Sequence, residues 1–127
     1  MSKNYSVKLS KFEEEVMGVL WRNGTCSVHE VIEALTDERK KNYTSVSTIL
    51  RILEGKKIVR AVKQGKKHFY SPCYSLNDHT KNTLVQIIEN AFSNQPAQLV
   101  SYLIDNSFLS KKDLQEIELF IGEKGEV

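Results

Sequence analysis

The chain has 127 residues, of which 40% are hydrophobic and 27% are charged, and its formal net charge at pH 7 is +2. This length allows one domain, or a small domain with an oligomerisation appendage, and the composition excludes global disorder. No apolar run approaches the roughly 18 residues that cross a bilayer, and the N-terminus lacks the apolar segment of a secretory signal. We therefore expect a cytoplasmic protein that does not enter a membrane.

The near-neutral total hides a strong separation of charge. Residues 39–67 carry nine net positive charges, because ten lysines and arginines stand against the single acid Glu54, and the rest of the chain sums to −7. Such segregation points to a polyanionic partner. A nucleic acid is the partner class that we expect.

Two short helices are predicted first, each opened by a capping box. In Ser10-Lys-Phe-Glu13 the serine oxygen can accept a hydrogen bond from a backbone amide of the first turn, and the glutamate side chain can accept one from the serine amide. This helix covers about residues 10–23, where a glycine ends it. Ser27-Val-His-Glu30 opens the second helix, which ends near Thr36. Apolar residues at three- and four-residue steps give both helices a buried stripe.

A third helix and a β-hairpin follow inside the basic window. Thr44 or Ser45 is expected to cap the helix, which is rich in hydroxyl side chains on its outward face. Two β-prone runs, 57–63 and 66–71, flank a turn at Gln64-Gly65. Three short helices and a Lys-rich hairpin are the pattern of a winged helix-turn-helix.

After residue 75 the chain is predicted to be helical, with eight acids and four lysines. Three short amphipathic helices cannot close a good core alone, so we expect them to form a homodimer. The expected interface residues are Leu84, Ile88, Leu99, Leu103, Leu114, Ile117, Phe120 and Ile121. The predicted fold is mainly α with a small β-hairpin: a winged helix-turn-helix DNA-binding domain over residues 1–74 and a helical dimerisation region over residues 75–127.

The third helix and the hairpin wing carry the expected contacts to double-stranded DNA. Arg51 can hold a guanine bidentately and is the leading base reader, whereas lysines beside the wing turn suit phosphates. The expected DNA-binding residues are Tyr43, Thr44, Ser45, Ser47, Thr48, Arg51, Lys63, Lys66 and Lys67. Two alternatives stay open: the helix start is ordinary capping with a solvated Arg51, and the charged hairpin only protects its edge strands.

Nothing in the sequence predicts catalysis, a metal or a cofactor. His29, His68 and His79 lie on different predicted elements and are not at metal-ligand spacing, so structural or surface roles are expected. Cys26 and Cys73 form no CxxC pair and are expected to be reduced thiols. No catalytic triad and no phosphate-cradling glycine loop can be assembled. We therefore expect a protein that is not an enzyme.

Several stretches resemble one family, the penicillinase and methicillin-resistance repressors (BlaI/MecI family). The resemblance rests on Glu15-Val-Met-Gly-Val-Leu-Trp21, on the run from Tyr43 to Leu53 and above all on Lys63-Gln-Gly-Lys-Lys-His-Phe-Tyr-Ser-Pro72. In the tail, Leu99-Val-Ser-Tyr-Leu103 and the segment from Leu109 to Leu114 are similar to the family's dimerisation helices. It covers nearly the whole chain.

That resemblance implies a homodimeric repressor whose two heads occupy successive major grooves of a palindromic operator. It also implies a regulatory partner, a membrane-linked metalloprotease that cuts the tail at an Asn-Phe bond. This chain contains no Asn-Phe dipeptide, and the corresponding place is Tyr102-Leu103. The copper-responsive relatives bear paired CxC motifs, whereas this tail has no cysteine. The sequence therefore leaves the inducing signal open.

Two departures from the family pattern lie near the third helix. Ile52 stands where the family usually has arginine, and Lys57 stands where it usually has glycine. Because Arg51 is adjacent, the basic contact is expected one position earlier. Two other functions stay open: a protein-interaction adaptor on a winged-helix fold, and a nucleic-acid-binding protein without sequence preference.

Overall fold

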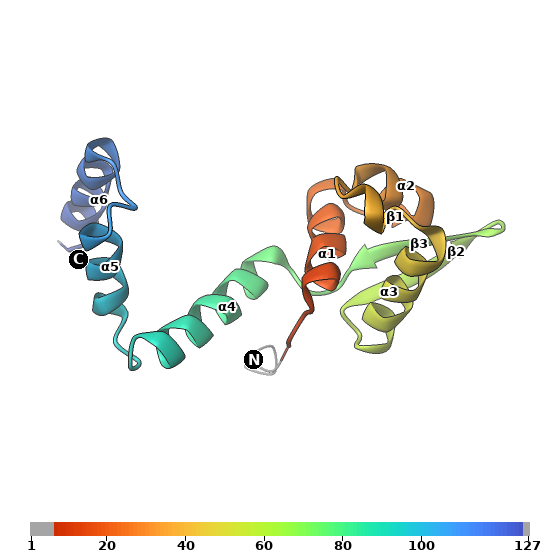
Figure 1. Cartoon of the computed structure of the whole chain (residues 1–127), viewed down its shortest axis with the longest axis horizontal. Coiled ribbons are helices and arrows are strands. Elements are labelled where there is room, and N and C mark those ends of the chain that lie inside the picture. The colour runs from red at the N-terminus through yellow and green to blue at the C-terminus, as the bar shows by residue number, and fades with distance from the viewer. Residues whose placement is uncertain (1–6, 126–127) are drawn as a thin grey trace. The chain divides into compact units, whose positions relative to one another are not determined.

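The computed structural model describes residues 7–125, with the Arg39 side chain left out. The expectation that the N-terminus carries no secretory signal concerns residues that lie mostly outside the described part of the chain. The elements are α1 (Lys11–Asn23), β1 (Cys26–Ser27), α2 (Val28–Ala34), the 3-10 turn η2 (Glu38–Lys40), α3 (Tyr43–Gly55), β2 (Val59–Gln64), β3 (Lys67–Pro72), α4 (Leu76–Ala91), α5 (Pro96–Asp105) and α6 (Lys111–Lys124) (Figure 1).

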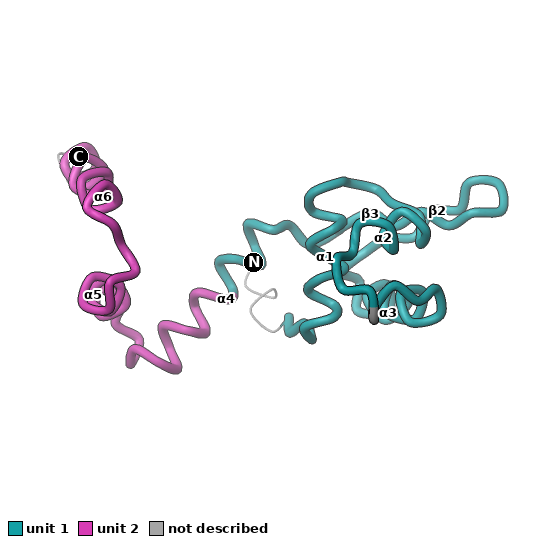
Figure 2. The backbone as a smooth tube through the Cα atoms, turned by 45° about the horizontal axis from the view of Figure 1, so that its top comes forward, with its two compact units in different colours: residues 1–82 teal, residues 83–127 magenta. Residues whose placement is uncertain are grey.

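The chain divides into two compact units, residues 1–82 and 83–127 (Figure 2). We call the first unit the head and the second unit the tail. Mainly helical structure with a small sheet confirms the predicted fold class. Within residues 7–125 no helix is both long and apolar enough to cross a membrane.

Two of the three head helices start as predicted. At α1 the Ser10 hydroxyl accepts the Glu13 amide at 3.1 Å, and the Ser10 amide donates to the Glu13 carboxylate at 2.7 Å. Ser27 and Glu30 form the same box at α2. The predicted cap of α3 is wrong, because Asn42 Oδ1 accepts the Ser45 amide. Asn42 is the cap, and α3 starts at Tyr43, earlier than a cap at Thr44 or Ser45 would place it.

The hairpin belongs to a three-stranded antiparallel sheet in the order β1-β3-β2. Gln64 pairs with Lys67, so the two-residue turn is Gly65-Lys66, one residue beyond the predicted Gln64-Gly65. Gly65 adopts φ 64°, which glycine tolerates without strain. The sequence did not predict β1, because two residues are too few to show a strand period.

The head core forms where α3 packs against α1, α2 and β2. Val16, Met17 and Leu20 of α1 are fully buried. From α3, Leu50 and Leu53 are fully buried in the same cluster. Each fully buried aliphatic side chain contributes about 1.5–3 kcal/mol.

The first turns of α4 are fixed to the head by hydrogen bonds. The Trp21 indole nitrogen donates to the Tyr74 carbonyl at 2.8 Å, and the Asn82 amide donates to the Tyr74 hydroxyl at 2.9 Å. His79 Nε2 lies 2.6 Å from the Glu14 carboxylate. Because of these contacts the head extends to Asn82, past the start of α4.

No described residue of the tail is buried. Ser110 and Asp113 form the predicted capping box of α6. An aromatic cluster links Phe92 to Tyr102 and Tyr102 to Phe108, with ring centroids 5.7 and 6.2 Å apart. Several large apolar side chains are exposed, namely Leu84, Ile87, Val100, Tyr102, Ile104, Phe108, Leu119, Phe120 and Ile121.

An ion pair with a buried carboxylate connects the start of α1 to Lys56, the residue that follows α3. Lys56 Nζ lies 3.0 and 2.9 Å from the two Glu13 carboxylate oxygens, and the Glu13 side chain is only 6% exposed. Burial by itself raises the pKa of Glu13, but the hydrogen bonds from Lys56 and the Ser10 amide outweigh it and hold this pKa below its ordinary value.

The lowered pKa of Glu13 predicts how head stability depends on pH. A carboxyl whose folded pKa is depressed stabilises the fold above its unfolded pKa and loses that contribution as pH falls through the folded pKa. We expect Glu13→Gln to lower the free energy of unfolding by about 1 kcal/mol at pH 7, and this difference should be smaller at pH 3. Urea unfolding of both proteins at the two pH values measures it. Glu33→Gln, at an exposed position on α2, is the control and should change little. A cost that is equal at both pH values would contradict the assignment.

Lys57 has a left-handed backbone with φ 65°. This conformation costs a non-glycine residue about 1–2 kcal/mol, which is the physical reason to expect glycine at this position. Because glycine also loses about 0.5–1 kcal/mol of chain entropy, we expect Lys57→Gly to stabilise the head by roughly 0.5–1 kcal/mol. Urea unfolding at pH 7 measures this gain. Lys57→Ala removes the same charge but keeps Cβ, so an equal gain in that variant would show that charge, not backbone, is responsible.

Candidate nucleic-acid interface

The outward face of α3 presents the predicted polar residues to solvent. Tyr43 is 53% exposed, and Thr44, Ser45, Thr48 and Arg51 are exposed as well. Ser47 is half-buried beside the sheet. This division follows from the helical period, because Val46, Leu50 and Leu53 occupy the opposite face. The helix therefore carries hydroxyl donors and one guanidinium on a single accessible side.

The wing presents its lysines around the hairpin turn. Lys63 ends up opposite His68 in the strand register, and Lys67 starts β3 directly after the turn residue Lys66. All three lysines are exposed. The hairpin tip projects beyond the helices of the head (Figure 1). These ammonium groups are accessible to a partner of the head.

A hollow between α3 and the wing brings the two sets of residues together. Its volume is about 190 Å³, and we call it the wing hollow. Its lining residues are Ser27, Val28, His29, Tyr43, Ser47, Lys66, Lys67, His68 and Tyr70. Four of the predicted DNA-binding residues thus meet at one place. Of the other five, Thr44, Ser45, Thr48 and Arg51 stay on α3 outside the lining, and so does Lys63 on β2.

Two histidines, His29 and His68, line the wing hollow although the sequence did not predict them as binding residues. The ring of His29 lies 5.1 Å from the ring of Tyr43, centroid to centroid, with 46° between the planes. His29 is on α2 and His68 is on β3, so only the folded chain brings them to the same lining. No sequence spacing could have signalled this proximity.

Three of the ten basic residues in the window serve the fold. Lys56 pairs with Glu13, Lys40 pairs with Glu15, and Lys41 Nζ lies 3.5 Å from Glu38. The others whose side chains are described are exposed and form no ion pair within residues 7–125, namely Arg51, Lys57, Arg60, Lys63, Lys66 and Lys67. The positive charge left for a partner is therefore concentrated on α3, on the wing and on the turn between them.

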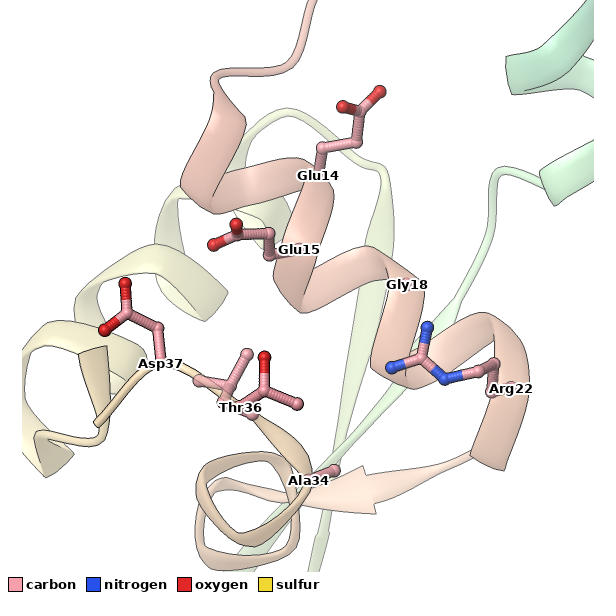
Figure 3. A pocket seen from close by; sticks show the side chains of 8 residues that line it. Glu14, Glu15, Gly18, Arg22, Ala34, Thr36 and Asp37 are labelled. Atoms are coloured by element: carbon pink, nitrogen blue, oxygen red, sulfur yellow. The ribbon is translucent and has the colours of Figure 1, made fainter. Parts of the chain in front are cut away.

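A second hollow, of about 470 Å³, lies between α1 and the end of α2. Figure 3 shows the carboxylates of Glu15 and Asp37 on one side and Arg22 on the other, with the Glu14 carboxylate pointing away from them. Glu14 contacts His79, and Glu15 pairs with Lys40. Its acidic lining repels a polyanion, so this hollow is not part of the nucleic-acid interface. In the described part of the chain no group of three or more His, Cys, Asp or Glu residues could hold a metal ion.

Several known proteins are similar to this chain. The chain is 22% identical over 120 residues to the penicillinase repressor of Staphylococcus aureus, covering 94% of this chain and 95% of that protein. It is 27% identical over 124 residues to the transcriptional regulator BlaI of Mycobacterium tuberculosis, covering 92% and 90%. A solved structure of Bordetella bronchiseptica BpsR, described for regulation of its DNA binding by 6-hydroxynicotinic acid, is similar at a TM-score of 0.47 and 17% identity, covering 91% and 75%.

The family model described as penicillinase repressor matches residues 9–123. This match spans both units and confirms the resemblance that the sequence motifs indicated. The chain therefore belongs to the penicillinase repressor family.

Proposed function

We propose that this chain is a sequence-specific transcriptional repressor that binds a palindromic DNA operator as a homodimer. Its family consists of transcriptional repressors and not of enzymes. One observation carries the proposal: the donors of α3 and the lysines of the wing meet at a hollow that no carboxylate lines. A surface of this kind is complementary to the phosphates and base edges of a duplex. A repressor must reach the chromosome, so we place it in the cytoplasm.

In this proposal the two faces of the interface have different tasks. Arg51 reads a base in the major groove, and the hydroxyls of Thr44, Ser45, Ser47 and Thr48 contact base edges or phosphates. Tyr43 and the lysines of the wing contact phosphates, which sets the position of the head without reading sequence. Residues 1–74 form the DNA-binding domain, and residues 75–127 form the dimerisation region.

The exposed apolar surface of the tail supports the homodimer. Among the predicted interface residues, Leu84, Phe120 and Ile121 are exposed, and the rest are half-buried: Ile88, Leu99, Leu103, Leu114 and Ile117. A unit of about this size rarely builds a sufficient core alone, and a second copy would cover these side chains. The regulatory protease is not part of the proposal, because the Asn-Phe bond is missing and Tyr102-Leu103 lies inside α5.

Fluorescence anisotropy tests the proposed function. The purified chain is titrated against the duplex upstream of its own gene, with a scrambled duplex as competitor, at several salt concentrations. We expect a preference of at least about a thousandfold for the native duplex. Equal, salt-sensitive binding to both duplexes would indicate an architectural protein, and no binding at low salt would indicate a protein-interaction adaptor; either result rejects the proposal.

Arg51 is expected to carry base discrimination. Arg51→Ala should weaken operator binding by about 1–3 kcal/mol and relax the preference at one base position. Competition with operator variants changed at single base pairs measures both effects. Arg60→Ala makes the same charge change on β2 and should leave the order of preference among the variants intact. Unchanged discrimination in Arg51→Ala would remove this residue from the interface.

The wing lysines are expected to determine part of the salt dependence. Lys66→Gln with Lys67→Gln should flatten the slope of log affinity against log salt by about two per protomer, because each phosphate contact contributes about 0.9. Anisotropy titrations between low and moderate salt give the slope. The matched control is Lys40→Gln with Lys41→Gln, since these lysines are paired within the head. If both double variants flatten the slope equally, net charge rather than wing contact is the cause.

Dimerisation through the tail is tested at Phe120, which is 61% exposed and so loses little packing within one chain. Phe120→Asp should raise the dimer dissociation constant at least about a hundredfold, because two copies each lose about 1.5–3 kcal/mol of burial. Sedimentation equilibrium measures this constant. Gln115→Asp introduces the same residue at an exposed position of α6 and should preserve the dimer. A dimer that persists in Phe120→Asp places the interface elsewhere.

A further inference from the structure

We propose that the wing hollow binds one phosphate group of the operator backbone, and that His29 and His68 hold it as imidazolium ions, which makes operator affinity rise as pH falls from 8 to 6. This inference rests on the proposed function and deepens it. It assigns a role to the two histidines for which the sequence predicted only structural or surface positions. It also links proton binding to DNA binding at the same interface.

The geometry of the hollow suits a single anion. A water molecule takes up about 30 Å³ of liquid, so a hollow of about 190 Å³ admits one phosphate group with some of its waters. Donors come from three elements: His29 from α2, Tyr43 and Ser47 from α3, and Lys67 from β3, with Lys66 at the turn. Such convergence surrounds an anion on several sides.

The electrostatics of the hollow favour an anion as well. No aspartate or glutamate lines it, whereas Lys66, Lys67 and both histidines do. The carboxylate of Glu30, next to His29 on α2, accepts the Ser27 amide at 2.8 Å in the capping box of this helix. The negative charge of Glu30 therefore lies toward the start of α2.

Tyr70 in the lining stays neutral between pH 6 and 8. Burial and then the nearby carboxylate of Glu54 raise the pKa of Tyr70, which Arg51 and Tyr43 also influence, Arg51 in the opposite direction. Tyr70 therefore stays protonated throughout the range from pH 6 to 8. A change of affinity within this range must come from groups that titrate there, and among ordinary side chains those are histidines.

The sign of the pH effect follows from charge. A phosphate in the hollow favours a positive charge on either histidine, because opposite charges attract at short range. An imidazolium also donates from both ring nitrogens, but a neutral imidazole donates from one. Binding of the duplex therefore takes up protons, and affinity rises as pH falls. Each fully linked proton changes the affinity about tenfold per pH unit.

The test measures operator affinity at pH 6, 7 and 8 at constant ionic strength, for the full chain and for His29→Gln with His68→Gln. Glutamine keeps a donor but does not titrate. We expect the original chain to bind at least about tenfold more tightly at pH 6 than at pH 8, and the double variant to change less than about threefold. The matched control is His79→Gln, which lies against Glu14 and should keep the full pH dependence. Thermal melts verify that each variant folds.

The outcomes separate this inference from the proposed function. If the original chain prefers the native duplex but its affinity does not depend on pH, or if the double variant keeps the dependence, the histidine assignment is wrong and the repressor stands. If no duplex is preferred at any pH, the proposed function itself fails.

A second measurement does not depend on any variant. NMR signals of the His29 and His68 rings are recorded with the operator duplex and with inorganic phosphate at the same ionic strength. Perturbation by the duplex alone supports a backbone phosphate in the hollow. Equal perturbation by both would make a free anion the occupant, and no perturbation by either would leave the hollow without an anion; both results overturn the inference.

Discussion

The head depends on one packing constraint, the burial of the apolar stripe of α3. Val46, Leu50 and Leu53 are completely buried against α1, α2 and β2. Because side chains three and four positions apart share one helical face, burial of this stripe forces the hydroxyls and Arg51 to the opposite, accessible side. The buried apolar face and the accessible polar face are therefore two consequences of how α3 is rotated about its axis.

Some basic residues of the window form ion pairs within the head, and the others leave their charge available to a partner. Lys56, which follows α3, is held by the buried Glu13 at the start of α1, and Lys40 is held by Glu15. A buried carboxylate without a cation is costly, so the Glu13–Lys56 pair stabilises the fold, whereas the Glu15 side chain is 37% exposed and its pair with Lys40 contributes less. The wing lysines form no ion pair with the described residues, so their charge is available to a polyanion.

The two units use apolar surface in opposite ways. The head closes a core around Leu20 and Leu50, and hydrogen bonds at Tyr74 attach the first turns of α4 to it. The described part of the tail buries none of its residues completely, although its helices carry Phe and Ile. A surface of that kind needs a partner, and we propose a second copy of the chain.

The sequence by itself determined the helix starts at Ser10, Ser27 and Ser110, the hairpin and the separation of charge, because capping boxes, strand periods and charge counts are local properties. It misplaced the cap of α3, since Asn42, Thr44 and Ser45 can all cap a helix and the local pattern does not tell them apart. The strand β1 and the wing hollow with His29 and His68 were decided by the tertiary structure alone. Both depend on contacts between residues about 40 positions apart, which no local pattern encodes.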